Sequence, residues 1–143
     1  MKFLFVLLLA LFSGVYGKAQ AAYFQADGAA IRGYDPVSYF KAGKPLKGTP
    51  EFSYRWSNAT WLFSSRENLE AFRSKPEKYA PQFGGFCAYG ASEQHKSPTD
   101  PQAWTIKDDK LYLNYSLKVK DLWLPDTVVR IPAAEKYWQS IQQ

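Results

Sequence analysis

The chain has few residues from which a covalent or metal-based site could be built. Its 143 residues include one cysteine, Cys87, and one histidine, His95. A single cysteine excludes an intramolecular disulfide, so the fold has to rest on a hydrophobic core. The chain also lacks a P-loop, a dinucleotide-binding glycine motif and a His-Glu-x-x-His sequence, which removes the best-marked nucleotide-binding and zinc-peptidase classes.

Long apolar runs are lacking too, except at the N-terminus. There Lys2 precedes Phe3–Phe12, about ten apolar residues, which is the size of a signal-peptide core. A membrane-spanning helix needs about 20 apolar residues, so this run is too short to span a bilayer. The alternative interpretation is an uncleaved N-terminal anchor.

Small residues follow this apolar run at the spacing that signal peptidase requires. They predict cleavage after Gly17 or after Ala21, and the sequence does not choose between the two. We therefore expect a signal peptide within residues 1–21 and a single exported domain over residues 22–143. The mature protein would be periplasmic or secreted, with no membrane span after cleavage.

Charge of one sign is not concentrated anywhere along the chain. The formal net charge is +5, but the lysines and arginines are scattered and form no basic cluster interleaved with aromatic residues. A nucleic-acid-binding groove needs such a cluster. We therefore expect no nucleic-acid partner.

Aromatic residues are abundant, at 17% of the chain, which indicates a folded core. Alternating aromatic residues predict a β-hairpin over 51–63, and a second hairpin is expected over 103–115. Predicted helices begin at Pro36 with Asp35 as N-cap, at Ser64 through a capping box with Glu67, and at Pro76. Further elements are a short strand over 29–32 and helices over 117–124 and 133–141, the last with Pro132 at its start. This mixture predicts a small α+β domain.

Several separated motifs resemble the YHS domain family. They are Asp35-Pro36-Val37, the segment Phe63–Phe72, and Pro76-Glu77-Lys78-Tyr79, in that order. The core of the resemblance covers about Gly33 to Tyr79. The remainder, above all the glycine-aromatic segment Tyr79–Ala88, is similar to a longer exported subfamily of YHS proteins, so the resemblance spans nearly all of the mature chain.

The differences from the family bear directly on function. Metal-handling YHS members read Asp-Pro-Val-Cys in the first motif and Phe-Cys-Ser-x-x-Cys in the second. This chain has Ser38, Ser64 and Asn68 where those cysteines stand. Thiolates bind soft metals, whereas a serine hydroxyl is neutral and a poor ligand for them. The resemblance therefore implies the fold without implying its metal site, and Ser64 and Asn68 are interpreted as a helix N-cap and an ordinary helix residue.

Cys87 and His95 are the strongest remaining soft-metal ligands, and with a tyrosine, Asp35 or a carbonyl group they predict a copper site. Two alternatives stay open for Cys87, a buried structural thiol and a reactive or redox thiol. For His95 the alternative is an exposed side chain without a role. A catalytic Cys-His pair would need an orienting third group, and neither Asp100 nor Asn114 has a spacing that indicates one.

Ligand-binding candidates come from the residues around these motifs, and they are Tyr34, Asp35, Phe86, Tyr89 and Trp104. The sequence thus predicts a non-enzymatic exported binding protein that holds a metal ion, with copper favoured, or a small ligand near Cys87. The alternative hypothesis is an interaction or structural protein of the envelope that has lost metal binding and acts through a protein partner. A cysteine-dependent enzyme is the third and least favoured hypothesis.

Overall fold

The computed structural model describes residues 22–143, and the predicted signal peptide and its cleavage sites lie outside them. The fold is α+β, as predicted, and its strands form three separate antiparallel hairpins. No helix among the described residues is long and apolar enough to cross a membrane.

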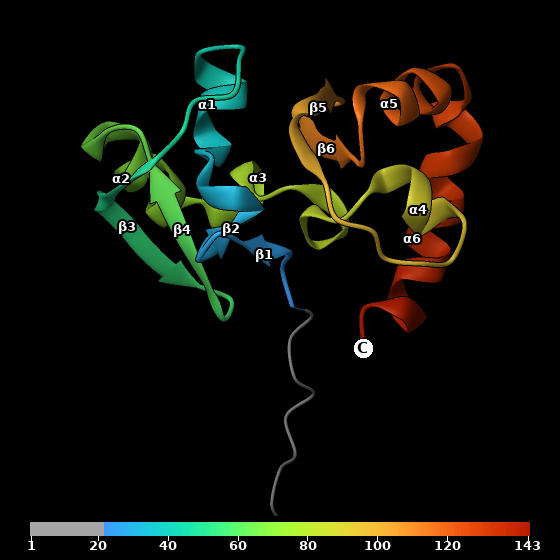
Figure 1. The fold of residues 1–143 in the computed structure, drawn as a ribbon, viewed down its shortest axis with the longest axis horizontal. Helices are drawn as coiled ribbons and strands as arrows, with labels where there is room; N and C mark the ends of the chain where they lie inside the picture. The colour runs from blue at the N-terminus through green and yellow to red at the C-terminus, as the bar shows by residue number, and fades with distance from the viewer. Residues whose placement is uncertain (1–21) are drawn as a thin grey trace, which may run out of the picture.

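Two halves lie side by side in Figure 1. The first half contains strands β1 (Gln25–Ala26), β2 (Ala29–Ala30), β3 (Thr49–Trp56) and β4 (Ala59–Phe63), the 3-10 turn η1 (Ile31–Gly33), and helices α1 (Pro36–Lys41), α2 (Arg66–Ser74) and α3 (Pro76–Tyr79). The second contains η2 (Gln82–Gly85), α4 (Ala88–Ser92), β5 (Asp100–Lys107), β6 (Lys110–Asn114), α5 (Leu117–Trp123), η3 (Leu124–Asp126) and α6 (Thr127–Ile141).

Strand β6 joins the two halves because both of its faces are buried. Successive side chains of a strand point to opposite faces. Leu111 and Leu113 pack into the core cluster of the first half, around Trp61 and Phe72. Tyr112 points the other way, into the cluster of the second half with Trp123. One strand thus contributes side chains to both cores, so the two halves pack directly against each other with no linker between them.

The hairpins β3–β4 and β5–β6 form where the sequence predicts them, because their turns suit their residues, whereas the β1–β2 hairpin was not predicted. The predicted strand over 29–32 is wrong beyond Ala30, because Ile31 and Arg32 adopt positive φ in η1. A two-residue type I′ turn requires positive φ at both central positions. Ser57 and Asn58 have φ of 52° and 58°, and Asp108 and Asp109 have φ of 50° and 59°. On β3 the side chains of Phe52, Tyr54 and Trp56 are half-buried and alternate with exposed residues, as predicted.

Two predictions about helix ends are wrong. The N-cap of α2 is Ser65, whose hydroxyl accepts a hydrogen bond from the Asn68 N–H at 3.1 Å, and Ser64 is not the cap. The last helix begins at Thr127, and Pro132 lies inside it. Proline has no N–H to donate to the carbonyl four residues earlier. That carbonyl belongs to Val128, which is highly exposed, so water can bond to it.

Candidate functional site

The three positions where the YHS resemblance places cysteines come together around one buried carboxylate. Asp35 is fully buried and caps helix α1, accepting hydrogen bonds from the N–H groups of Val37 at 2.8 Å and Ser38 at 3.3 Å. Its other oxygen, Oδ2, accepts three more bonds, from the Ser64 N–H at 2.9 Å, the Ser64 hydroxyl at 2.7 Å and the Asn68 amide at 2.7 Å. The Ser38 hydroxyl donates to the Asp35 backbone carbonyl at 2.7 Å.

This cluster of Asp35, Ser38, Ser64 and Asn68 does not fit a soft metal ion. It contains no thiolate or imidazole, and the protons of Ser64 and Asn68 are committed to the carboxylate. Charge-assisted hydrogen bonds of this kind are short and strong. The cluster therefore joins α1 to the start of α2 through hydrogen bonds, and the interpretation of Ser64 and Asn68 as a cap and an ordinary helix residue is wrong.

Cys87 is a buried free thiol that ties together two segments of the second half. Its Sγ accepts hydrogen bonds from the N–H groups of Gly90 at 3.4 Å and Tyr115 at 3.3 Å, and lies 3.5 Å from Asn114 Oδ1. Its backbone N–H donates to the Ser97 carbonyl at 3.0 Å. Cys87 therefore holds two distant segments in place, one next to Pro98 and one at Tyr115.

His95 lies on the surface and has its own partners. Its ring stands against Gly90, and its Nδ1 lies 3.2 Å from the Ser97 hydroxyl. Within residues 22–143 no group of three His, Cys, Asp or Glu side chains is placed to hold one metal ion. The copper site at Cys87 and His95 remains a prediction. Copper loading of the purified protein tests it, because stoichiometric binding that Cys87→Ala abolishes supports the site, and failure to bind copper contradicts it.

The thiol of Cys87 should be protected in the folded protein, since only 2% of the residue is exposed. We expect its reaction with a thiol reagent such as Ellman's reagent to be at least about a hundredfold slower in native buffer than in denaturant, because reaction requires exposure. The unfolded chain is the internal control. A rapid stoichiometric reaction in native buffer would instead indicate an accessible, reactive thiol.

The other predicted ligand-binding residues are not gathered at one site. Phe86 packs against Phe24, and Tyr89 lies under the Arg130 guanidinium at 3.8 Å. Trp104 packs against Tyr39 at 5.4 Å between ring centroids. Tyr34 lies between η1 and Asp35, half-buried. The rings of Phe86, Tyr89 and Trp104 thus each have a protein neighbour of their own.

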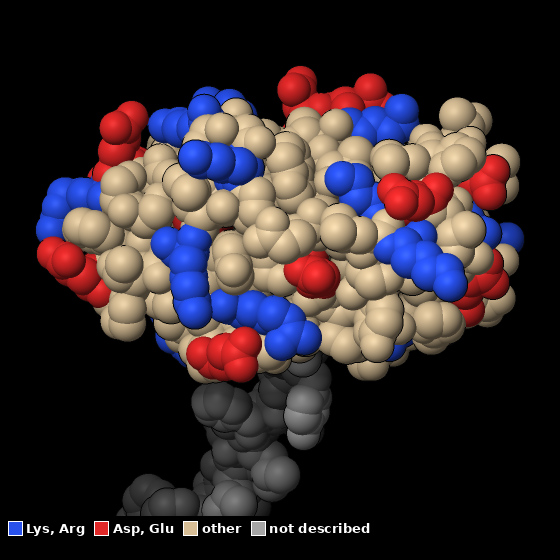
Figure 2. All heavy atoms as spheres, turned by 45° about the horizontal axis from the view of Figure 1, so that its top comes forward, with Lys and Arg blue, Asp and Glu red and all other residues tan. Residues whose placement is uncertain are grey.

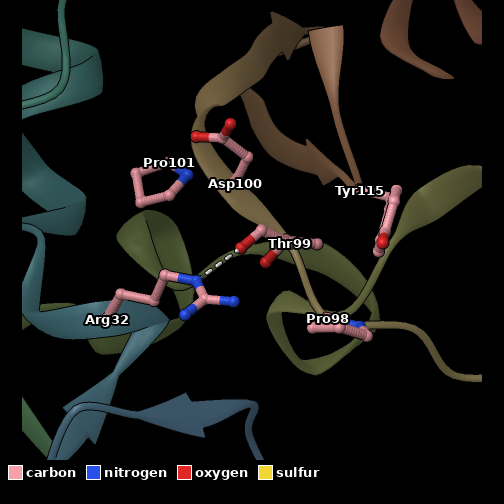
Figure 3. A pocket seen from close by; sticks show the side chains of 6 residues that line it. All are labelled: Arg32, Pro98, Thr99, Asp100, Pro101 and Tyr115. Carbon is pink, nitrogen blue, oxygen red and sulfur yellow. Dashed lines mark hydrogen bonds between the residues drawn. The ribbon is translucent and has the colours of Figure 1, made fainter. Parts of the chain in front are cut away.

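A cleft that the sequence did not predict lies where the two halves meet. It has a volume of about 340 Å³ and is lined by Arg32, Pro98, Thr99, Asp100, Pro101 and Tyr115. We call it the Arg32 cleft (Figure 3). The side chain of Arg32 reaches it from η1. The other residues come from the loop before β5, from the start of β5 and from the position that follows β6.

Strained backbone at η1 positions the side chain of Arg32 at the cleft. Ile31, Arg32 and Gly33 have successive φ values of 44°, 59° and 78°. A β-branched residue with positive φ is an outlier, and each non-glycine residue in this region costs about 1–3 kcal/mol. The strain is held by the buried Ile31 side chain and by a bond from its N–H to the Phe24 carbonyl at 2.9 Å.

The guanidinium of Arg32 is oriented, yet part of it is free. Its Nε donates to the Thr99 carbonyl at 3.0 Å, and its carbon lies 5.4 Å from the centroid of the Phe24 ring. A long contact of 3.7 Å joins Nη1 to the largely exposed Asp27. Because guanidinium carries five N–H donors, several remain for a ligand.

The opposite wall of the cleft is fixed by hydrogen bonds to both halves. The Tyr39 hydroxyl donates to the Pro101 carbonyl at 3.0 Å, and the Thr99 hydroxyl donates to the Gly85 carbonyl at 2.7 Å. Burial raises the pKa of Tyr39, and the nearby Tyr34, Asp100 and Asp35 raise it further, so this hydroxyl stays protonated and remains a donor. The wall is therefore set before any ligand arrives, which lowers the entropic cost of binding.

Comparison with family models, with curated proteins and with solved structures found no match for this chain. Of the residues lining the cleft, the sequence singles out only Asp100 as a functional candidate, as the third group of a Cys-His pair, a role that its spacing does not indicate. The only local signal is Pro98-Thr99-Asp100-Pro101, whose two prolines indicate a rigid loop.

Proposed function

We propose that this protein is an exported, non-enzymatic binding protein with a YHS-type core, and that its ligand is a small carboxylate held in the Arg32 cleft. The observation that carries the proposal is the left-handed run Ile31–Gly33, which positions Arg32. Strained backbone of this kind is concentrated at active sites and ligand-binding sites. The convergence of Ser38, Ser64 and Asn68 on Asp35 supports the YHS-type core.

A carboxylate suits the cleft because of the donors that Arg32 leaves free. Guanidinium binds carboxylate through two parallel charge-assisted hydrogen bonds, a geometry that lysine does not offer. The prolines present no N–H donors, and Tyr115, which also lines the cleft, is 57% exposed as a residue. The polar part of a ligand would thus contact Arg32 and its apolar part would contact Tyr115 and the prolines.

The same residues favour recognition over catalysis. The Thr99 hydroxyl is engaged by the Gly85 carbonyl, and the buried Cys87 thiol lies behind the wall, bonded to the Tyr115 N–H. A nucleophile needs a base within hydrogen-bond reach, and the lining residues supply no such pair. Cys87 then acts as a structural residue of a ligand site that lies near it.

The test is a calorimetric titration of the purified protein with hydrocinnamate, an aromatic carboxylate. We expect a dissociation constant on the order of 1 mM or below, and at least about tenfold weaker binding by Arg32→Met, because the charge-assisted bonds are lost. Methionine keeps the length and apolar character of the side chain.

Two controls accompany this titration. Arg55→Met removes an exposed arginine of β3 outside the cleft and should bind as the wild type does. The neutral amide of hydrocinnamate should bind more weakly than the acid. Equal affinities of wild type and Arg32→Met for hydrocinnamate, or no binding by either, would refute the proposal.

A second candidate is the envelope interaction protein, and one observation favours it. The exposed large apolar side chains among the described residues all fall in one stretch that runs from the end of β6 to the start of α6. They are Tyr115, Leu117, Leu122, Leu124, Val128 and Val129. Clustered exposed apolar residues mark interaction surfaces. Arg32→Met would leave a role at this surface unchanged, which separates the two candidates.

A further inference from the structure

The Arg32 cleft presents two opposite charges that do not pair with each other. Arg32 and Asp100 both line it, yet no ion pair joins them, and the ionic partner of Arg32 is Asp27. Within the described residues Asp100 makes no ion pair. In Figure 3 the carboxylate of Asp100 and the guanidinium of Arg32 lie on different sides of Thr99.

Asp100 is held in place by its own loop. Its Oδ1 accepts a hydrogen bond from the Gln102 N–H at 2.9 Å, which closes a turn at the start of β5. Its other oxygen has no hydrogen-bond partner among the described residues. One oxygen thus orients the carboxylate and the other is left to accept from a ligand.

We infer that the ligand is a zwitterion, an amino acid whose carboxylate binds Arg32 and whose ammonium group binds Asp100. This inference rests on the proposed function, because it concerns the same cleft. A ligand with only a carboxylate meets the repulsion of Asp100, and a ligand with only an ammonium group meets the repulsion of Arg32. A zwitterion satisfies both charges, so the cleft selects against each singly charged analogue.

The rest of the cleft suits an amino acid with an apolar side chain. A volume of about 340 Å³ lies at the small end of the range for small-molecule sites. Pro98, Pro101 and the exposed Tyr115 add apolar surface to the lining of the same cleft. Aromatic rings favour offset or edge contacts with one another, which Tyr115 can make with an aromatic side chain.

Three probes that share a phenylethyl group test the inference by calorimetry on the purified protein. Phenylalanine carries both charges, hydrocinnamate lacks the ammonium group, and phenethylamine lacks the carboxylate. We expect phenylalanine to bind about tenfold or more tightly than hydrocinnamate, since it adds a charge-assisted hydrogen bond. Phenethylamine should bind more weakly than either.

The matched variant is Asp100→Asn, whose amide oxygen can still accept from the Gln102 N–H and keep the turn. It should remove the advantage of phenylalanine and leave hydrocinnamate bound as well as before or better. Asp121→Asn, on the exposed side of α5, is the control and should change neither affinity. Circular dichroism spectra matching the wild type would show that each variant is folded.

The outcomes separate this inference from the proposed function. If hydrocinnamate binds in an Arg32-dependent way and phenylalanine gains nothing over it, the zwitterion inference is overturned and the proposed function stands. If Asp100→Asn leaves the preference for phenylalanine intact, the inference is also overturned. If neither hydrocinnamate nor phenylalanine binds, the proposed function fails first.

Discussion

Asp35→Asn should destabilise the protein by about 3 to 5 kcal/mol, because buried donors would lose their acceptor. The carboxylate of Asp35 accepts bonds from five donors, three of them at Oδ2. An asparagine in the same place must turn its NH2 group toward one set of these donors. Either orientation leaves at least two buried N–H or O–H groups facing another donor.

Urea denaturation followed by circular dichroism measures this effect, and a thermal melt should show a fall of about 10 °C or more. Ser64→Ala, which removes one hydroxyl donor, should cost about 1 kcal/mol and gives a graded readout if Asp35→Asn does not fold. The exposed Asp121→Asn is the control and should stay within about 0.5 kcal/mol of wild type. An Asp35→Asn variant as stable as the control would show that the cluster does not hold α1 and α2 together.

Gly48→Ala should cost about 3 kcal/mol or more, because there is no room for a side chain. A Cβ atom at Gly48 would lie 2.4 Å from the carbonyl carbon of Leu62 and 2.6 Å from the backbone nitrogen of Phe63. Both atoms belong to the backbone of β4 and cannot rotate away. The first strand of the hairpin would have to move off β4, just before Ser64 and the Asp35 cluster.

Gly43→Ala separates this steric effect from backbone strain. Gly43 has a φ of 65°, and a Cβ there would meet no atom within 4 Å. Alanine at Gly43 should therefore cost about 1 kcal/mol from its strained conformation alone. Urea denaturation of both variants gives the comparison, and equal costs at the two positions would contradict the close contact of Gly48 with β4.

Local signals account for the parts of the fold that were predicted correctly. Asp35 followed by Pro36 begins α1 with the predicted cap, since both residues act within a few positions along the chain. The β3–β4 hairpin follows from the alternation of Phe52, Tyr54 and Trp56. The wrong N-cap of α2 has a tertiary cause. Ser64 and Ser65 both carry a hydroxyl group at the start of the helix, but the Ser64 hydroxyl donates to Asp35, so Ser65 is the cap.

The candidate site was predicted less well, because its residues are far apart in the sequence. Arg32 and Thr99 are 67 positions apart, and only the packing of η1 beside β5 brings them together. Nothing in the sequence Ile31-Arg32-Gly33 indicates that an isoleucine and an arginine adopt positive φ, since glycine is the usual residue there. The sequence singles out Cys87 because it is the only thiol. The tertiary structure shows that Cys87 is hydrogen-bonded to Tyr115 and to Ser97, which lies next to the cleft residue Pro98.

The surface, too, has one feature that the sequence predicted and one that it did not. The scattered lysines predicted no single-sign patch, and on the face drawn in Figure 2 basic and acidic side chains are interspersed. The sequence could not indicate that the exposed apolar side chains would gather between Tyr115 and Val129. Their exposure depends on which sides of α5 and α6 are covered by α4 and β5.

The sequence by itself determined the α+β class, the hairpin turns and the α1 cap, because those depend on residues a few positions apart. It also determined that Ser38, Ser64 and Asn68 stand at the three positions where the resemblance to YHS domains would place cysteines. Only the tertiary structure decided that these three residues bond to Asp35, that β6 fills two cores, and that Arg32 and Asp100 line one cleft without pairing. Contacts of that kind join distant segments, and they are set by packing that no local pattern encodes.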